Sequence, residues 1–370
     1  IYPIKTLIGC TSVCKHWNSF IKSPSFISTH LNSSTPIKDI FFICLDASTK
    51  KCCYHLEPDD QKFDNFELVN FPFRKTSYNV LASINGLLFI STPNAFILWN
   101  PTIHRCFLLS DFNSNHTTVR SDDFFIGFGY DSVSDDYKFV KLESSEELGI
   151  QIEVFSLKSD SWNKIASKSN LRVKSLPPEN SQAFVNGDIH CIACKESGFP
   201  ILLKFDLGDE VLSEITLPKD LGDNDEVIWS DISPIVYKDS TIGLFDSNSR
   251  SEQSSLWLMK KYGVENSWAR VLTLRHDLRR NMAPEVLGCR NEGEDDSRGK
   301  MAPKILGCRK DGEIMVVEYS NEYREDLYAY KLEENSVISW RIVITREYEG
   351  GSLFGVFVGS IAQSLVLLNH

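Results

Sequence analysis

Asn85-Gly86-Leu87-Leu88-Phe89-Ile90, a turn pair that opens an apolar run, decides the fold because the chain repeats this pattern. Asn-Gly and Asp-Gly pairs adopt the positive φ angles of tight hairpin turns. The five turn pairs begin at positions 85, 135, 186, 239 and 311, so their spacings are 50, 51, 53 and 72 residues. The sequence therefore predicts a repeated unit of antiparallel strands. The other four pairs are Asp135-Asp136, Asn186-Gly187, Asp239-Ser240 and Asp311-Gly312.

A second series marks a later strand of each unit, in which an aromatic or aliphatic residue stands just before a polar turn. Its members are Trp99, Phe155, Phe205, Trp257 and Ala329, at intervals of 56, 50, 52 and 72 residues. The last interval is again the long one, so both series point to one local insertion between positions 257 and 311.

That insertion is a tandem duplication. Met282 to Arg290, MAPEVLGCR, recurs as MAPKILGCR from Met301 to Arg309, at an offset of 19 residues that turns each spacing of 72 into 53. We expect the duplication near 282–309 to form a loop or a redundant strand within one unit. The polar stretch between the copies, residues 292–300, is expected to stay solvated.

A period near 50 residues with several strands per unit is typical of kelch-type propeller blades, which are four-stranded sheets. Setting aside the N-terminal segment and the insertion leaves room for about six blades of about 52 residues. The final apolar runs, Leu353 to Val358 and Leu365 to Leu368, are expected to pair with Ile40 to Leu45 and close the ring. The predicted fold is an all-β, kelch-like propeller.

Residues 1–31 differ from the rest of the chain, because their apolar residues recur at spacings of three and four. This spacing predicts an amphipathic helix that ends near Ser23, since Pro24 disfavours the α conformation in the residue before it. The residues that share the stripe are Leu7, Cys10, Val13, Cys14, Trp17, Phe20 and Ile21.

Composition excludes several classes of protein. No apolar run of this 370-residue chain approaches the roughly 18 residues of a membrane helix, so we expect a soluble protein with no membrane partner. The ten Cys are scattered through a long chain, which favours a reducing compartment, the cytoplasm or the nucleus. A net charge of -11 argues against nucleic-acid binding and favours basic protein partners.

Three patterns that could indicate a metal or cofactor site have simpler interpretations. Cys191 and Cys194 form a C-x-x-C, but on a strand they point to opposite faces. Gly127-Phe128-Gly129 lacks the third glycine of a dinucleotide motif. The acids Asp131, Asp135 and Asp136 lack the closing Glu of a calcium loop and are typical of a hairpin turn. We expect no metal and no cofactor.

Catalytic patterns are also missing, because no His is spaced as a base beside a nucleophile and no Ser lies in a G-x-S-x-G elbow. We therefore predict no catalytic residue and no enzyme. The Trp residues that recur in register with the units are expected to pack in the core and not to form a ligand cage. They are Trp99, Trp162, Trp257, Trp268 and Trp340.

Two sets of motifs carry a resemblance to a known family. Pro3-Ile4-Lys5-Thr6-Leu7 and Val13-Cys14-Lys15-His16-Trp17 resemble the C-terminal part of a plant F-box. Trp99-Asn100-Pro101-Thr102, Gly127 to Asp131 and Trp257 to Lys260 resemble, in order, landmarks of the F-box-associated interaction domain. The resemblance implies a helical F-box part at 1–31 followed by a propeller domain at 38–370.

The resemblance also implies a function, the substrate-recognition subunit of a Skp1-cullin-F-box ubiquitin ligase. The F-box would bind a Skp1-like adaptor and through it a cullin and a RING subunit, while the propeller would hold the target protein for ubiquitination. Trp17 is expected in the core of the F-box. The residues implied for the Skp1 surface or its support are Pro3, Ile4, Leu7, Val13, Cys14, Trp17 and Ile21. The target and the residues that bind it are not predicted.

Alternatives remain open at this point. The usual opening Leu-Pro helix of the F-box is missing because the chain starts at Ile1, so a truncated, ligase-independent binding scaffold is one of them. An S-locus F-box protein that recognises basic style ribonucleases is another, since the chain is acidic. A propeller hydrolase or oxidase is disfavoured, because no acid-base set or metal ligands emerge.

Overall fold

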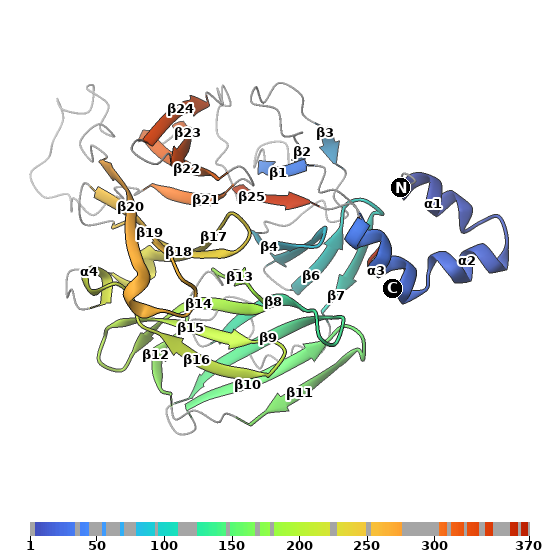
Figure 1. Ribbon diagram of the computed structural model, residues 1–370, viewed down its shortest axis with the longest axis horizontal. Helices are drawn as coiled ribbons and strands as arrows, with labels where there is room; N and C mark the ends of the chain where they lie inside the picture. The colour runs from blue at the N-terminus through green and yellow to red at the C-terminus, as the bar shows by residue number, and fades with distance from the viewer. Residues whose placement is uncertain are drawn as a thin grey trace, which may run out of the picture. The chain divides into compact units, whose positions relative to one another are not determined.

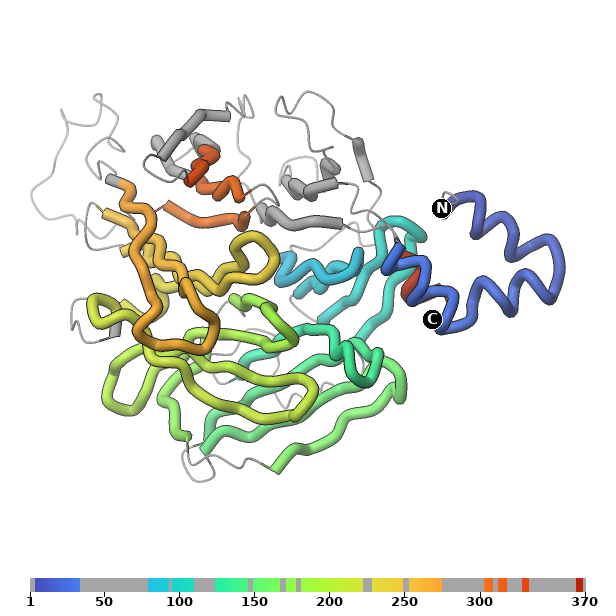
Figure 2. Tube along the Cα trace, viewed as in Figure 1, coloured from blue at the N-terminus to red at the C-terminus, as the bar shows by residue number. Residues whose placement is uncertain are grey.

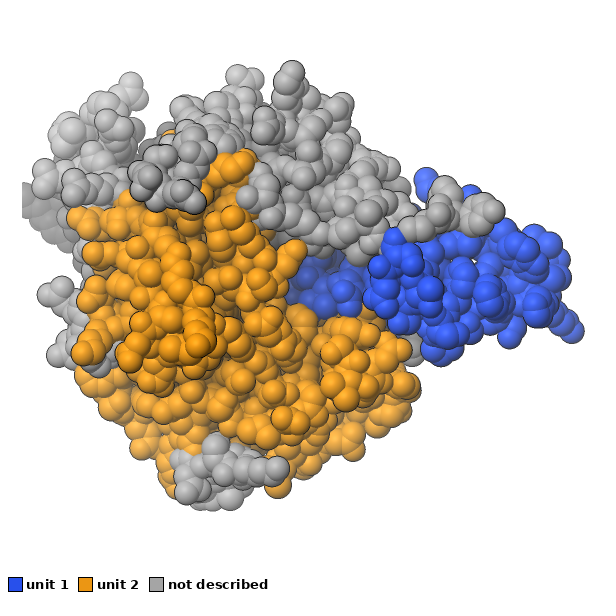
Figure 3. Space-filling model, in the orientation of Figure 1, with its two compact units in different colours: residues 1–121, 349–370 blue, residues 122–348 orange. Residues whose placement is uncertain are grey.

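A computed structural model of the chain shows two compact units, residues 1–121 with 349–370 (unit 1) and residues 122–348 (unit 2) (Figure 3). Each unit is described by itself. The structure describes residues 4–33, 38–43, 54–56, 67–69, 79–92, 95–109, 124–145, 149–166, 171–177, 181–222, 228–248, 253–275, 303–308, 312–321, 324–332, 337–342, 356–361 and 364–368.

Unit 1 begins with three helices, α1 (Ile4–Cys10), α2 (Lys15–Ile21) and α3 (Pro24–Ser33) (Figure 1). A turn at residues 11–13 divides the single stripe that the sequence predicted. The Cys14 Sγ accepts a hydrogen bond from the Trp17 N–H at 3.5 Å and so caps α2. The predicted stop near Ser23 is confirmed, and Pro24 then opens α3, where its missing N–H costs nothing.

The strands described in unit 1 form two four-stranded antiparallel sheets, in the orders β25-β1-β2-β3 and β4-β5-β6-β7. Their bounds are β1 (Lys38–Ile43), β2 (Tyr54–Leu56), β3 (Glu67–Val69), β4 (Asn79–Ile84), β5 (Leu87–Thr92), β6 (Ala95–Asn100), β7 (Arg105–Leu108) and β25 (Val356–Ile361).

The last strand of the chain completes the first sheet. β25 pairs antiparallel with β1, with Phe41 opposite Val358, which confirms the predicted pairing of the C-terminal run with the strand near Ile40. The second predicted run, Leu365 to Leu368, is not a strand. It lies in a turn, because Leu365 and Leu368 pack against the helices of unit 1.

Unit 2 contains four described sheets (Figure 1). Three of them consist of β8 to β11, β17 to β20 and β21 to β24. The fourth has the order β12-β14-β15-β16, and β13 also pairs with β14. Together with unit 1, the described residues therefore form six sheets, in line with the predicted propeller blades. The bounds are β8 (Phe124–Asp131), β9 (Asp136–Ser145), β10 (Gly149–Ser156), β11 (Ser161–Ile165), β12 (Val173–Ser175), β13 (Ala183–Val185), β14 (Asp188–Lys195), β15 (Pro200–Asp206), β16 (Val211–Ile215), α4 (Lys219–Gly222), η1 (Trp229–Asp231), β17 (Ile232–Tyr237), β18 (Thr241–Asp246), β19 (Gln253–Met259), η2 (Glu265–Ser267), β20 (Trp268–Arg275), β21 (Lys304–Cys308), β22 (Glu313–Asn321), β23 (Arg324–Leu332) and β24 (Val337–Ile342).

Four of the five turn pairs of the sequence are hairpin turns in the structure, and Asp311 of the fifth pair lies outside the described residues. Asn85, Asp135, Asn186 and Asp239 have φ angles of 52°, 53°, 55° and 60°, and each lies between two paired strands. Only Gly, Asn, Asp and a few other residues tolerate this left-handed conformation well, which is why these residues carry the repeat.

The structure describes most of the second copy of the duplication. This copy contributes β21, the first strand of a regular sheet, where Ile305 and Leu306 are buried and Gly307 lies at a register shift. The second copy is thus an integral strand and not an insertion. The first copy, residues 282–290, and the polar residues 291–300 lie outside the described residues.

Close packing between sheets explains the Gly-Phe-Gly motif of β8. A Cβ atom on Gly127 would lie 2.7 Å from Ile189 Cγ2, and one on Gly129 would lie 2.4 Å from Leu207 Cδ1. Ile189 and Leu207 belong to the neighbouring sheet. The glycines therefore let two sheets of unit 2 approach, and the motif lies on strand β8 itself.

The recurring Trp residues contribute to packing. Trp99 and Trp257 are buried, with 0% and 9% of their surface exposed, and Trp162 and Trp268 are half-buried. The side chain of Trp340 lies outside the described residues. Core packing is therefore confirmed for Trp99 and Trp257, whereas Trp268 is held at the edge of its sheet by a hydrogen bond from Nε1 to the Thr216 carbonyl at 2.9 Å.

Candidate functional site: an exposed helical face

The inner side of the three helices is anchored to the end of the chain. Ile4, Leu7 and Ile21 are 2%, 6% and 1% exposed and form one cluster with Leu365 and Leu368. Figure 2 shows the blue helices beside the red C-terminal turn of the same unit. Burying such side chains stabilises the arrangement by about 1.5–3 kcal/mol each, so the helices are firmly held.

The C-terminal turn is itself fixed by one buried polar side chain. Asn100, at the end of β6, is 0% exposed, and its Nδ2 donates to the carbonyls of Ser364 and Val366 at 2.9 and 2.8 Å. Its Oδ1 accepts from the N–H of Thr102 at 3.0 Å, which starts the β6–β7 turn. Asn100 therefore connects the strand, the turn and the platform on which the helices rest.

The outer side of the helices carries large apolar side chains in water. Val13, Trp17 and Phe20 are 72%, 48% and 56% exposed. Trp17 and Phe20 are three residues apart on α2 and so lie on neighbouring positions of one face. The centre of the Phe20 ring also lies 5.0 Å from that of Phe26 of α3, with the ring planes tilted by 56°, and this contact helps to order the face. Exposed aromatic residues gathered in this way are typical of a protein-binding surface.

The structure divides the predicted Skp1-binding residues into two groups. Ile4, Leu7 and Ile21 point inward, whereas Val13, Cys14 and Trp17 are exposed. Pro3 lies outside the described residues. The prediction that Trp17 lies in the core is wrong, because the C-terminal turn provides the partner of Ile21 and Leu7 and leaves the Trp17 side of α2 uncovered.

Two features of this face were missed by the sequence reasoning. Phe20 was not assigned to the site, although its spacing of three from Trp17 is a signal that the sequence contains. Charge is the second feature: residues 1–33 contain three Lys and no Asp or Glu, whereas the whole chain has a net charge of -11. A basic segment that carries exposed apolar residues favours an acidic partner.

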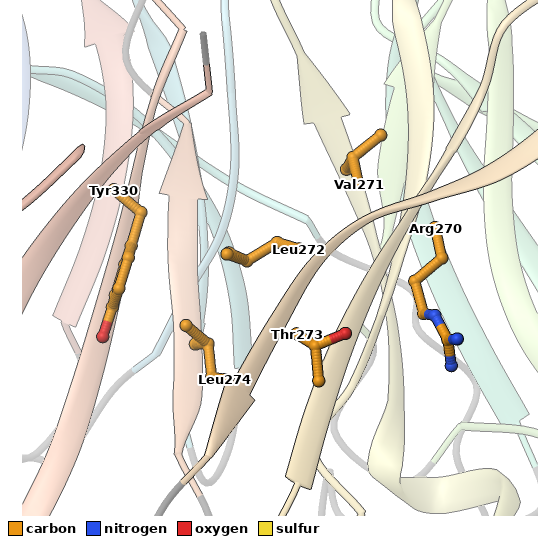
Figure 4. A pocket seen from close by; sticks show the side chains of 6 residues that line it. All are labelled: Arg270, Val271, Leu272, Thr273, Leu274 and Tyr330. Atoms are coloured by element: carbon orange, nitrogen blue, oxygen red, sulfur yellow. The ribbon is translucent and has the colours of Figure 1, made fainter. Parts of the chain in front are cut away.

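A cavity in unit 2 is a second concave feature. It has a volume of about 320 Å³ and lies between β20 and β23, lined by Arg270, Val271, Leu272, Thr273, Leu274 and Tyr330. Figure 4 shows Leu272 and Leu274 pointing toward Tyr330, with Arg270 and Thr273 on the other side of β20. The Arg270 guanidinium lies 5.5 Å from the centre of the Trp257 ring. The cavity wall thus combines aliphatic side chains with polar groups, and the Arg270 side chain is exposed.

The residues that could have indicated metal chemistry have structural roles. Cys191 and Cys194 lie on β14, and burial raises the pKa of both thiols, which keeps them protonated. Asp131 accepts from the N–H of Val133 at 2.9 Å, as expected in a hairpin turn, and pairs with Lys138 Nζ at 3.0 Å. Among the described residues, no group of three or more His, Cys, Asp or Glu is arranged to hold a metal ion.

The helices that the structure describes include none long and apolar enough to cross a membrane.

Comparison with known proteins decides the family. A family model described as the F-box associated beta propeller domain matches residues 39–349. The chain belongs to this family. The F-box-associated domain therefore covers all six described sheets except the last strand and the first residue of β1.

Its relatives include F-box proteins of Arabidopsis thaliana. F-box protein CPR1 is 29% identical over 297 residues, which cover 74% of this chain and 70% of the relative. F-box/kelch-repeat protein At3g23880 is 22% identical over 294 residues, 74% of this chain and 76% of the relative. Of solved structures, the SapL1 lectin in complex with alpha methyl fucoside aligns with a TM-score of 0.45 and 8% identity, over 85% of this chain and 98% of the lectin.

Proposed function

We propose that this protein is the target-recognising subunit of a Skp1-cullin-F-box ubiquitin ligase. The family and the F-box relatives support the general role of an F-box protein with a propeller domain. The observation that carries the proposal is the exposed apolar face of Val13, Trp17 and Phe20, held on a rigid base. Such a face is costly to leave in water and is relieved by a protein partner.

In this proposal the residues of the helices have two roles. Val13, Cys14, Trp17 and Phe20 contact the Skp1-like adaptor, whereas Ile4, Leu7 and Ile21 support them from below. Pro3 keeps the role that the resemblance implies. The division into an F-box part at 1–31 and a propeller domain at 38–370 belongs to the same proposal, in which the propeller domain holds the target.

The protein itself performs no chemistry in this proposal. The adaptor leads to the cullin and RING subunits, and a separate conjugating enzyme transfers ubiquitin to the bound target. The ten Cys scattered through this long chain favour a reducing compartment such as the cytoplasm or nucleus.

Co-purification with a Skp1-like adaptor tests the proposal, with this chain and with a version extended by its upstream coding sequence. Trp17→Ala should weaken binding by about 30-fold or more, the effect of losing an aromatic hot spot worth about 2 kcal/mol. Leu108→Ala and Val133→Ala are matched controls, because both side chains are exposed, at 55% and 89%, and neither residue belongs to the helices. Failure of both unmodified versions to bind any adaptor would refute the proposal.

A further inference from the structure

A buried group of polar side chains joins two neighbouring sheets of unit 2. Asp188 and His190 lie on β14 and are 4% and 0% exposed. Tyr262 belongs to the β19–β20 connection of the next sheet, and its hydroxyl contacts both Asp188 Oδ2 and, at 2.9 Å, His190 Nε2. The other ring nitrogen, Nδ1, lies 3.2 Å from the carbonyl oxygen of Ala183.

These contacts form a chain with an acceptor at each end. The Ala183 carbonyl can only accept, and so can the Asp188 carboxylate when it is ionised. Three contacts lie between them: Ala183 to His190, His190 to Tyr262, and Tyr262 to Asp188. Each contact needs one hydrogen. A neutral imidazole and a phenol supply only two, so the chain is one proton short while Asp188 is ionised.

A single added proton satisfies the whole chain. If Asp188 carries it, Asp188 O–H donates to the Tyr262 oxygen, Tyr262 O–H donates to His190 Nε2, and His190 Nδ1–H donates to Ala183. Water supplies the proton, and the ion pair of Asp188 Oδ2 with Lys204 Nζ is weakened because the carboxyl becomes neutral. Without the proton, a buried lone pair faces another at one of the contacts, which is unfavourable where the dielectric constant is low.

The neighbouring charges favour the carboxyl as the proton's place. Burial is the main influence on His190 and lowers its pKa to about 4, and Lys204 adds to the effect, so the ring stays neutral. Burial raises the pKa of Asp188, although hydrogen bonds from Tyr262 and Lys204 oppose it. Burial also raises the pKa of Tyr262, which keeps its proton.

The charged groups that face this cluster come from β15. Lys204 lies opposite His190 in the sheet and places Nζ 3.1 Å from Asp188 Oδ2, while Asp206 lies opposite Asp188. Asp206 is a negative charge that favours proton uptake by Asp188, and Lys204 is a positive charge that opposes it. Lys204 is 26% exposed, so water partly screens its effect.

We propose that Asp188, Tyr262 and His190 form a proton-binding junction, in which one proton taken up by the Asp188 carboxyl completes the hydrogen-bond chain and fastens the β19–β20 connection to β14. The same connection is also held by Glu265, which accepts from Thr216 Oγ1 at 2.7 Å. The junction therefore tightens an existing contact between two sheets when the pH falls.

The direction in which stability changes with pH follows from the raised pKa of Asp188. An unfolded Asp titrates near about 3.9, so the stabilisation is complete below about that pH and is lost as the pH rises through the higher pKa of the folded protein. The titration of His190 has the opposite sign, because its folded pKa is lowered. A test must therefore compare variants that share His190.

Asp188→Asn is the central variant, because its amide donates to Tyr262 at every pH as the protonated carboxyl would. We expect its melting temperature at pH 8 to exceed that of the unmodified chain by about 2 °C or more, with the difference vanishing toward pH 4. In a Tyr262→Phe background the gain should disappear. Lys204→Gln removes the ion pair with Asp188 but keeps the carboxyl. In this variant the pH at which the stabilisation is lost should be higher than in the unmodified chain.

A gain in Asp188→Asn that persists with Tyr262→Phe, or no gain at pH 8, would overturn the proposal. If Asp188→Asn does not fold, the unmodified chain still decides. Its His side chains are labelled with ¹⁵N, and the His190 signals are assigned by comparison with His190→Gln. At pH 7 we expect a neutral ring, because burial lowers the pKa of His190 to about 4. A doubly protonated ring would refute the placement of the proton on Asp188.

Discussion

Replacing Asn100 by Ala should loosen the packing of helices α1 to α3 within unit 1, although the hydrogen bonds of its side chain run to the C-terminal turn and to the β6–β7 turn. The side chain donates two hydrogen bonds, of 2.9 and 2.8 Å, to the carbonyls of Ser364 and Val366. Each bond contributes about 1 kcal/mol net, and a buried carbonyl left without a donor costs about 1–3 kcal/mol. We therefore expect the C-terminal turn to lose about 3 kcal/mol of local stability.

Leu365 and Leu368 belong to that turn, so the loss of its stability also weakens the packing of Ile4, Leu7 and Ile21. A decrease of about 3 kcal/mol corresponds to an increase of about 100-fold in amide hydrogen exchange of residues 4–33, if they open with the turn. Hydrogen exchange followed by mass spectrometry measures this directly. Leu108→Ala is the control, since Leu108 is on the adjacent strand β7 and is exposed.

Unchanged exchange of residues 4–33 in Asn100→Ala, with increased exchange of residues 364–368, would show that the helices do not depend on the turn. Hydrogen exchange in Asn100→Ala equal to that of the unmodified chain at every residue would show that water replaces the lost donor. Either result would refute the coupling described here.

Three further changes test other parts of the fold. Deleting residues 282–300 removes one copy of the duplication and keeps β21, so the melting temperature should change by less than the equivalent of about 1 kcal/mol. Gly129→Ala places a Cβ 2.4 Å from Leu207 Cδ1 and should lower the free energy of unfolding by about 1–3 kcal/mol in a denaturant titration followed by fluorescence. A denaturation midpoint equal to that of the unmodified chain would contradict the close packing. Burial raises the pKa of Asp131, but hydrogen bonds from Ser134 and Lys138 outweigh it and lower this pKa to about 2. This stabilisation is present above about pH 3.9 and is lost as the pH falls through about 2, so Asp131→Asn should cost about 1–2 kcal/mol at pH 7 and flatten the acid limb of a melting profile.

The repeat was readable from the sequence because its signals are local. A residue with positive φ must be Gly, Asn, Asp or one of few others, so each hairpin turn leaves a mark at its own position. Asn85 and Asn186 carry such marks, and both lie in the turns that the spacing predicted. The strand that follows each turn is likewise visible as an apolar run, so the fold class followed from one chain.

The exposed face of the helices was not readable in the same way. The helical spacing places Trp17 and Ile21 on one stripe, but only the structure shows that Ile21 is covered and Trp17 is not. The covering residues, Leu365 and Leu368, lie more than 340 positions later in the chain. Burial that depends on such distant partners has no local pattern.

Buried ionisable residues were missed for a related reason. Asp188 follows a turn pair, where an acid normally faces water, and Lys138 stands at the start of a strand. Both are buried, at 4% and 8% exposure, because the turns of a neighbouring sheet reach over them: Lys138 Nζ donates to the Leu207 carbonyl at 2.9 Å. The sequence of one unit does not reveal the polar groups that the next unit supplies.

The pairing of β25 with β1 also sets an order of events during synthesis of the protein. Unit 2, residues 122–348, emerges from the ribosome before the segment that completes unit 1. Helices α1 to α3 therefore lack their packing partners Leu365 and Leu368 until these residues, more than 340 positions after Ile21, have been synthesised. A product that ends before Leu365 lacks the platform on which the helices pack. The exposed face of Val13, Trp17 and Phe20 is thus supported only in chains whose synthesis has passed Leu368.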